Sequence, residues 1–341
     1  MDTQHTFDIF IVASPGLEDI LLNEVIEKGF ANPLVSPGGI TIQGGWSDVW
    51  RANLELRGAT RVLARIGSFM AFHLAQLDKR ARKFPWAQIL RPDVPVRVQV
   101  TTKASRIYHA GAATQRIETA LHESLGATIS PEAALVLKVR IDDNVVTISL
   151  DTSGESLHKR GHKEAVGKAP MRETLAALLL GKAGYRGTET VVDPMCGSGT
   201  FVIEAAEIAL GLNPGRSRQF AFESLASFDA DAFAALRNTA PKSTNLRFFG
   251  SDRDAGAIRM SRANAERAGV SDLTNFENHA AGQLQPPPGG PGLVMVNPPY
   301  GGRIGNKKLL YPLYATLGQT LLDRFKGWRV GLVTSEPPLA K

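Results

Sequence analysis

The sequence predicts an α/β protein in which an open sheet of parallel strands follows smaller α+β units. Strand and helix patterns alternate from residue 190 to residue 334, an order typical of a parallel sheet with crossover helices. The first of these strands, 190–193, leads through a glycine turn into an apolar helix. Residues 7–69 follow the order β-α-β-β-α-β, which is typical of a small ferredoxin-like α+β domain.

The first segment begins with a strand at 7–12, where apolar residues alternate and then run together. A helix follows at 17–28, because apolar residues recur at helical spacing, acids occupy its first turn and Gly29 ends it. The remaining elements are short strands at 34–35 and 39–42, a helix at 46–54 and a strand at 59–69.

A second small unit is expected from about residue 71 to residue 150. Valines alternate with Arg97 and Gln99 in a strand at 94–101, and a helix at 110–125 ends at Gly126. Two further strands form a hairpin across Asp142-Asp143. The other expected elements are a basic helix at 74–82, a short helix at 86–90 and the hairpin strands 134–141 and 144–151.

A basic connector with three glycines, 154–168, leads to a Leu- and Ala-rich helix at 171–182 that Pro170 opens. The cations of the connector are expected to continue an RNA-facing surface; they are Lys159, Arg160, Lys163 and Lys168. A polar insertion is expected at 213–245. The other expected elements are strands at 190–193, 246–250, 273–277, 292–296 and 328–334, with helices at 200–211, 254–268 and 309–325.

Composition narrows the class of protein. The chain of 341 residues is 43% apolar, which is ordinary for a globular protein, and no apolar run approaches the ~20 residues that cross a bilayer. Residues 1–10 are polar, so no signal peptide is expected. The single cysteine, Cys196, excludes an internal disulfide and favours a reducing, cytoplasmic location.

Positive charge is concentrated in one stretch. The net charge is +6, yet residues 57–106 alone hold eleven cations against Asp78 and Asp93. Such a run is often only a solvated surface, but its one-sidedness favours contact with RNA or DNA. His109 and His122 stand alone and are interpreted as surface or packing residues, so no metal site is predicted.

The turn after the strand at 190–193 indicates a cofactor. Gly197 and Gly199 begin a dinucleotide fingerprint, but Val202 stands where its third glycine would be. Asp193 ends the strand and suits an ammonium group, while Asp252 ends the next strand and can accept hydrogen bonds from ribose hydroxyls. S-adenosylmethionine fits this pattern because it has an ammonium, a ribose and no phosphate. A nicotinamide cofactor is disfavoured, and Cys196 is interpreted as a small packed residue.

A second motif, Asn297-Pro298-Pro299-Tyr300, follows the strand at 292–296. A proline turn alone would explain it. The functional interpretation is methylation of a base amine, because the Asn297 side-chain oxygen and the Pro298 carbonyl can accept the two amine hydrogens. The prolines would fix these acceptors beforehand, and Tyr300 would stack on the base.

Together, Asp193-Pro194-Met195-Cys196-Gly197-Ser198-Gly199-Thr200 and Asn297-Pro298-Pro299-Tyr300-Gly301 resemble the Rossmann-like class I methyltransferases that carry an N-terminal THUMP domain, nearest to the bacterial 23S rRNA guanine-N2 methyltransferases. Residues 151–161 and 169–176 resemble that family's linker and pre-sheet helix. The resemblance implies a ferredoxin-like domain at 1–70, a THUMP RNA-binding domain at 71–152, a linker at 153–169 and a methyltransferase domain at 170–341.

The resemblance also implies the site residues. Asn297, Pro298 and Tyr300 would act at the target base. The cofactor would be held by Asp193, Pro194, Gly197, Gly199, Thr200, Asp252, Arg253, Asn278, Pro170 and Thr174. Basic residues proposed to bind RNA are Lys79, Arg80, Arg82, Lys83, Lys103, Arg106, Lys159 and Arg160.

Two departures from the family pattern stand out. Ala280 occupies the place of an acid that contacts the adenine amine, and Asn278 is the candidate substitute. Only five of the seven strands usual in such sheets can be placed before Lys341, so the last two are expected to be missing from this chain.

The leading hypothesis is transfer of a methyl group from S-adenosylmethionine to guanine N2 in large-subunit rRNA. The base must leave its stack to reach Asn297. Transfer to tRNA is the nearest alternative. A DNA adenine-N6 methyltransferase shares the Asn-Pro-Pro-Tyr logic but would not need the N-terminal domains. A non-catalytic RNA-binding or ribosome-assembly factor is the alternative from another class, and it predicts no cofactor binding.

Overall fold

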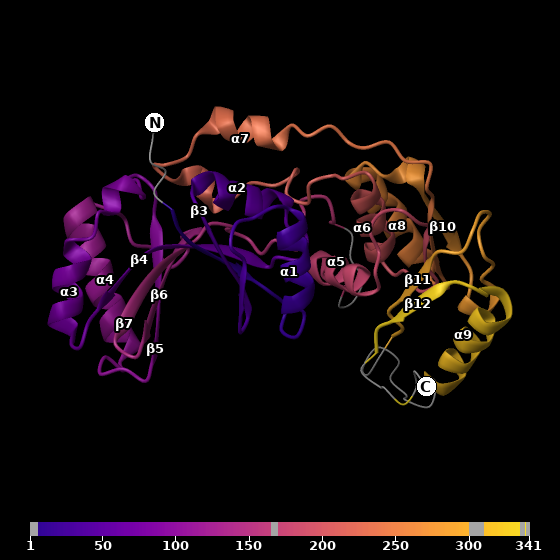
Figure 1. Cartoon of the computed structure of the whole chain (residues 1–341), viewed down its shortest axis with the longest axis horizontal. Coiled ribbons are helices and arrows are strands. Elements are labelled where there is room, and N and C mark those ends of the chain that lie inside the picture. The colour runs from indigo at the N-terminus through magenta and orange to yellow at the C-terminus, as the bar shows by residue number, and fades with distance from the viewer. Residues whose placement is uncertain (1–5, 165–169, 300–309, 335–337, 339–341) are drawn as a thin grey trace. The chain divides into compact units, whose positions relative to one another are not determined.

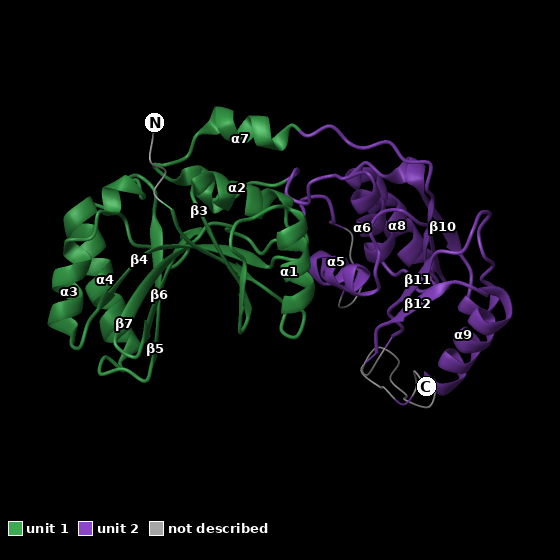
Figure 2. Cartoon of the chain, in the orientation of Figure 1, with its two compact units in different colours: residues 1–157, 218–238 green, residues 158–217, 239–341 purple. Residues whose placement is uncertain are grey.

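The structure is a computed structural model (Figure 1) that describes residues 6–164, 170–299, 310–334 and 338. The chain forms two compact units, shown in different colours in Figure 2. The first unit comprises residues 1–157 and 218–238, and the second comprises residues 158–217 and 239–341. The chain therefore leaves the second unit within the predicted insertion and then returns to it.

The first unit is built on one continuous seven-stranded sheet of order β2-β3-β1-β4-β7-β6-β5. The strands predicted for two separate small domains are joined in it, because β4 pairs with β7 in antiparallel register. Only β5 and β6 run parallel. The strands are β1 (Phe7–Val12), β2 (Leu34–Ser36), β3 (Gly39–Gly44), β4 (Arg61–Met70), β5 (Val96–Lys103), β6 (Leu135–Asp142) and β7 (Val145–Asp151).

Register explains why this sheet has one apolar face. Ile9 lies opposite Ala64, Ala64 opposite Leu150, and Leu150 opposite Leu137. These four side chains are buried, and because paired residues point to the same side of a sheet they form one continuous surface. Helices pack over it. They are α1 (Glu18–Glu27), α2 (Trp46–Glu55), α3 (Leu74–Arg82) and α4 (Ala110–Leu125), with the short 3-10 helix η1 (Trp86–Gln88).

The segment 218–238 joins the first unit through aromatic packing. Trp50 on α2 contacts Phe222, Phe228 and Phe233, with ring centroids 5.8–6.3 Å apart. Phe220 stacks on Phe222 at 5.0 Å. This finding differs from the prediction of a polar insertion over 213–245. Its elements are the 3-10 helix η2 (Ala221–Ser224) and helix α7 (Ala230–Arg237).

The second unit contains a five-stranded parallel sheet of order β10-β9-β8-β11-β12. The order confirms the predicted Rossmann-like fold: β8 is central and the chain moves first to one side of it and then to the other. Its strands are β8 (Val191–Asp193), β9 (Phe248–Asp252), β10 (Thr274–Asn278), β11 (Leu293–Val296) and β12 (Arg329–Leu332). Its helices are α5 (Glu173–Lys182), α6 (Thr200–Ala209), α8 (Ala255–Ala268) and α9 (Leu310–Arg324), with the 3-10 helices η3 (Ser271–Leu273) and η4 (Ala281–Gln283).

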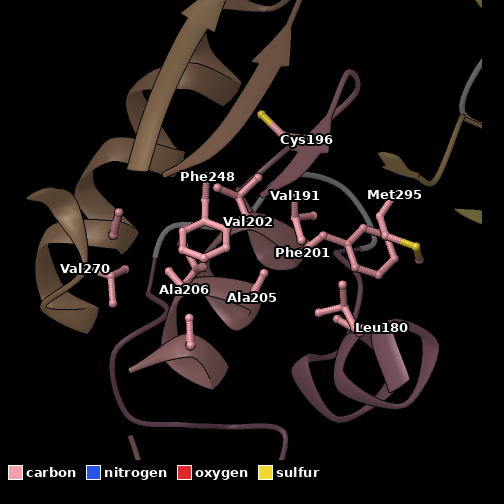
Figure 3. Close-up of a cluster of buried hydrophobic side chains, with 14 of the residues drawn as sticks. Leu180, Val191, Cys196, Phe201, Val202, Ala205, Ala206, Phe248, Val270 and Met295 are labelled. Carbon is pink, nitrogen blue, oxygen red and sulfur yellow. The ribbon is translucent and has the colours of Figure 1, made fainter. Parts of the chain in front are cut away.

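Helix α6 forms the centre of the second unit's core (Figure 3). Phe201 and Val202 at its start are buried among strand residues that include Val191, Phe248 and Met295. A fully buried side chain of this kind contributes about 1.5–3 kcal/mol through removal of apolar surface from water. The helix is therefore fixed against the sheet at the end where β8 turns into it.

Candidate functional site

The carboxyl ends of β8, β9 and β11 meet at one edge of the parallel sheet, where ligands bind in open α/β folds. Two cavities lie there, of about 280 Å³ and about 510 Å³. We call them the first and second cavity. Both are lined by Met195, Gly197, Asp252 and Asn297. The two motifs singled out in the sequence thus contribute to one site.

The glycine turn connects β8 to α6. Gly197 and Gly199 have φ values of +54° and +83°, a region that side chains strongly disfavour. A Cβ on Gly199 would also lie 3.1 Å from the ring of Phe276. Gly199 lines neither cavity, so its role is to allow the turn, while Gly197, Ser198 and Thr200 reach the first cavity. The N–H groups at the start of α6 favour a ligand there.

Asp193 is the last residue of β8 and is 2% exposed. It accepts a hydrogen bond from the Met195 N–H at 3.0 Å. Burial, with a smaller contribution from the nearby Asp252 charge, raises its pKa to about 8 against the opposing effect of that hydrogen bond. The first cavity is lined by Asp193, Asp252 and Asp254 and by no basic side chain among the described residues. A cationic ligand therefore suits it, and a pyrophosphate does not.

Asp252 is held in position by two backbone N–H groups. Gly197 donates to Oδ2 at 3.0 Å, and Asp254 donates to Oδ1 at 2.9 Å. A carboxylate has about four acceptor positions, so each oxygen can accept a further hydrogen bond from a ligand. The arrangement fits a pair of ribose hydroxyls.

Asn297 follows β11 and faces both cavities. Its Oδ1 is buried and has no hydrogen-bond partner among the described residues. An unsatisfied buried acceptor costs about 1–3 kcal/mol, which indicates a position prepared for a donor. Pro298 beside it is buried, and Pro299 lines the second cavity. Tyr300 lies outside the described residues.

The remaining predicted cofactor residues differ in position. Pro170 and Thr200 line the first cavity, and Pro194 and Arg253 line the second. Thr174 is buried on α5 and lines neither cavity. Asn278 is exposed at the end of β10 and donates to the Asp252 carbonyl at 2.8 Å, while Ala280 lines the second cavity. Asn278 thus supports Asp252, and the second cavity has an apolar wall at Ala280 where the family pattern has an acid.

Lys163 is a residue that the sequence reasoning placed on a basic RNA-facing connector. Its side chain is only 8% exposed and its Nζ pairs with Glu173 at 2.9 Å. The same Nζ donates to the Met171 carbonyl and to Thr200 Oγ1, each at 2.9 Å. Because Met171 and Thr200 line the first cavity, Lys163 positions two separate segments of its wall.

Helix α8 carries two further residues that the sequence reasoning missed. Ser261 donates to the Gly197 carbonyl at 2.8 Å, and Asn264 donates to the Ser198 carbonyl at 3.1 Å. Both side chains are fully buried. Together they hold the carbonyls of the glycine turn. The available signal was the presence of polar residues at core positions of an otherwise regular amphipathic helix.

The predicted RNA-binding residues are distributed over both units. Lys79, Arg80 and Arg82 lie on α3 and Lys83 caps it, while Lys103 ends β5 and Arg106 follows it. Arg82 pairs with Asp78 and Glu123. Lys159 is exposed. Arg160 was also predicted to bind RNA, and the structure contradicts this prediction. Its side chain is 1% exposed and pairs with Glu204 at 3.2 Å, so it cannot reach RNA.

Cys196 and His109, the other titratable residues singled out in the sequence, have structural roles. Burial raises the pKa of the Cys196 thiol, which keeps it protonated and a poor nucleophile. His109 caps α4 by accepting the Ala112 N–H at 3.1 Å. Across the described ranges, no three His, Cys, Asp or Glu side chains are grouped as metal ligands. Within the same ranges, no helix has the length and apolar content needed to span a membrane.

Comparison with known proteins adds independent findings. A family model described as "RMKL-like, methyltransferase domain" matches residues 160–341, and one described as "RlmL ferredoxin-like domain" matches residues 8–63. Two proteins named ribosomal RNA large subunit methyltransferase K/L, from Chromohalobacter salexigens and Psychromonas ingrahamii, are each 32% identical over 97% of this chain. The chain spans about half of their length, 48% and 46% respectively.

Solved structures resemble the whole chain. One, described as a predicted N6-adenine-specific DNA methylase from Listeria monocytogenes, has a TM-score of 0.89 and 32% identity over 98% of this chain and 90% of its own. Another, SMU.472, was solved in complex with SAH. It has a TM-score of 0.85 and 26% identity over 98% of this chain and 91% of its own.

Proposed function

The chain belongs to the family of RMKL-like methyltransferases, and from this premise we propose that it methylates the exocyclic N2 amine of a guanine in large-subunit rRNA. Membership confirms the methyltransferase class and the donor, S-adenosylmethionine, predicted from the sequence. The observation that carries the proposal is the buried, unpartnered Asn297 Oδ1 beside an acidic cavity. A THUMP-type role of residues 71–152 is part of the proposal.

The residues of the site fit this donor. When bound, S-adenosylmethionine supplies a methyl group on a positively charged sulfur. In our proposal Asp193 holds the ammonium group in the first cavity, where no basic side chain competes for it among the described lining residues. Asp252 accepts hydrogen bonds from the ribose hydroxyls at the acceptor positions that its two backbone donors leave open. Pro194 and Arg253 border the adenosine side in the second cavity.

The base end of the site rests on Asn297. A guanine N2 amine is a weak nucleophile because its lone pair is delocalised into the ring. If Asn297 Oδ1 and the Pro298 carbonyl accept the two amine hydrogens, the nitrogen is held pyramidal and its lone pair is directed away from the ring plane. Because these acceptors are fixed in advance by a proline turn, they need no reorganisation during the reaction.

The experiment that tests the proposal is methyl transfer from labelled S-adenosylmethionine, followed by nucleoside analysis. Substrates are unmodified large-subunit rRNA, tRNA and duplex DNA, supplied separately. We expect N2-methylguanosine in the rRNA. The same nucleoside in tRNA alone would show that the RNA substrate is tRNA. N6-methyladenine in DNA would show that the target is adenine in DNA.

Each alternative has its own discriminating result. The Listeria structure is described as a predicted N6-adenine-specific DNA methylase. Adenine in DNA is therefore the specific alternative target, because an Asn-Pro-Pro-Tyr site can serve either amine. A non-catalytic assembly factor would bind no cofactor, and calorimetry with S-adenosylmethionine tests this directly. We further propose that the enzyme works in the cytoplasm.

A further inference from the structure

The face of the first unit's sheet that lies opposite its helices has a groove lined by charged, polar and apolar side chains. It is formed by β1 and β4–β7 and has a volume of about 960 Å³. We propose that this sheet groove holds a single-stranded segment of the RNA substrate. The inference rests on the proposed function and adds to it a binding surface distinct from the basic helix α3.

Register places the groove's polar side chains in continuous rows. Lys138 lies opposite Ser149 and beside Gln99, and Arg140 lies opposite Thr147. Leu137 and Val139, one position away, are buried, and because successive side chains of a strand alternate between the two faces, Lys138 and Arg140 point to the other face. The same face also carries Thr101 and Thr147, with apolar side chains such as Phe10 and Leu63 between the polar ones.

The charge of the groove is complementary to a phosphate backbone. Its cations are Arg65, Lys103, Lys138 and Arg140, and its acids are Asp8 and Asp142. Asp8 pairs with Arg65 at 3.4 Å, and Asp142 pairs with Arg140 at 2.6 Å. Lys138 lies 4.0 Å from the buried Asp151, which also pairs with Arg61 at 2.7 Å. With Arg61 and Asp151 included, five cations face three acids, and this excess of positive charge neutralises phosphates and releases counterions when RNA binds.

A stacking platform lies within the same surface. The Arg65 guanidinium sits 4.9 Å from the centroid of the Phe10 ring, and the Arg65 side chain is 32% exposed. Unstacked bases pack on arginine planes and aromatic rings. The hydroxyl and amide groups of Gln99, Thr101 and Ser149 stand beside the cations and can contact base edges or ribose hydroxyls.

The size of the groove favours an unpaired strand. Five neighbouring strands spaced about 4.8 Å apart span about 19 Å, and sheet faces of this kind hold two or three stacked bases. A double helix hides its base faces and would leave the platform unused. Single-stranded RNA therefore makes fuller use of the groove than a duplex does.

The test measures binding of a fluorescein-labelled 12-nucleotide single-stranded RNA, and of a duplex of the same sequence, by anisotropy at several salt concentrations. The full-length chain carries either Lys138→Ala with Arg140→Ala, or Arg65→Ala. A charge-matched control carries Lys28→Ala with Lys326→Ala, two exposed lysines outside the groove. A second pair, Lys79→Ala with Lys83→Ala, tests the cations of α3. Methyl transfer by the unchanged chain is measured in parallel.

We expect the Lys138/Arg140 pair to weaken single-strand binding at least tenfold and to reduce the salt slope by about 0.7 for each lost phosphate contact. Arg65→Ala should weaken single-strand binding more than duplex binding, and the control pair should leave both unchanged. The proposal would be overturned if the groove variants kept wild-type affinity and salt slope, or if only the Lys79/Lys83 pair lost binding. Methyl transfer to RNA by the unchanged chain would still uphold the proposed function in that case. Absence of wild-type transfer would instead count against the function.

Discussion

Asp193 shows what a single residue contributes when its surroundings are known. It is buried, its pKa is about 8, and no cation pairs with it among the described residues. A ligand ammonium would stabilise the carboxylate form, so binding must displace the proton that Asp193 carries below pH 8. The position of this acid at the strand end was evident in the sequence, but its protonation state depended on burial.

We predict that the contribution of Asp193 to affinity for S-adenosylmethionine, measured as the difference between the wild type and Asp193→Asn, rises as pH increases toward about 8 and levels off above it. Below that pH the folded, cofactor-free chain holds a proton that binding must release, and above it the carboxylate is already formed. Calorimetry from pH 6 to pH 9 in buffers of different ionisation enthalpy measures both affinity and proton release. Asp193→Asn is the matched control that retains titration of the ligand itself. Identical pH profiles for the variant and the wild type would contradict the role of Asp193.

Lys163 gives a second prediction at this scale. Lys163→Met should weaken cofactor binding about tenfold because Met171 and Thr200 lose their shared donor, and it should also destabilise the chain by leaving Glu173 buried without a partner. The double variant Lys163→Met with Glu173→Gln should recover stability but not affinity, and Lys163→Arg should recover part of both. Recovery of full affinity in the double variant would mean that Lys163 serves stability alone. Lys159→Met, at an exposed neighbour, is the control.

The basic connector marks a limit of sequence reasoning about single residues. Lys163 and Arg160 were both expected at the surface because they lie in a glycine-containing basic segment. Their partners, Glu173 and Glu204, lie on helices that the sequence also predicted. Glu204 within an apolar helix was the clue, because a buried carboxylate requires a cation. Which cation pairs with the buried carboxylate depends on the fold, because the fold brings distant segments together.

At the scale of elements, the helices and strands were predicted well, because the signals that set them are local. The helix at 110–125 has the expected bounds, and Gly126 ends it in the left-handed conformation. The segment 218–238 was the main failure. Its phenylalanines are irregularly spaced, so they gave no helical or strand period, and the residue that gathers them, Trp50, lies about 170 residues away.

The aromatic cluster around Trp50 gives the prediction at this scale. Phe222→Ala should lower the free energy of unfolding by about 3–5 kcal/mol, since Phe222 is fully buried and its removal leaves a cavity. Urea unfolding followed by tryptophan fluorescence measures the effect. Tyr108→Ala, at a residue 82% exposed, should change stability by no more than about 0.5 kcal/mol. Equal effects at the two positions would show that segment 218–238 does not stabilise the first unit.

At the scale of the whole molecule, the fold class and the methyltransferase family were predictable, and the strand pairing between the small domains was not. Pairing of β4 with β7 joins strands about 80 residues apart, and no local pattern specifies which edge a strand will choose. The chemistry was more predictable because it sits on short motifs: Asp193, Asp252 and Asn297 were each recognised at a strand end and meet at the same cavities.

We propose that two residues of one site have separate functions: Asp252 holds the cofactor and Asn297 acts on the base. The most direct test measures the cofactor dissociation constant and the single-turnover rate of methyl transfer to rRNA in Asn297→Ala and Asp252→Ala. Asn297→Ala should abolish transfer and change the dissociation constant by less than threefold. Asp252→Ala should raise the dissociation constant at least tenfold and keep most of the rate at saturating cofactor. Parallel loss of affinity and transfer in Asn297→Ala would contradict the claim.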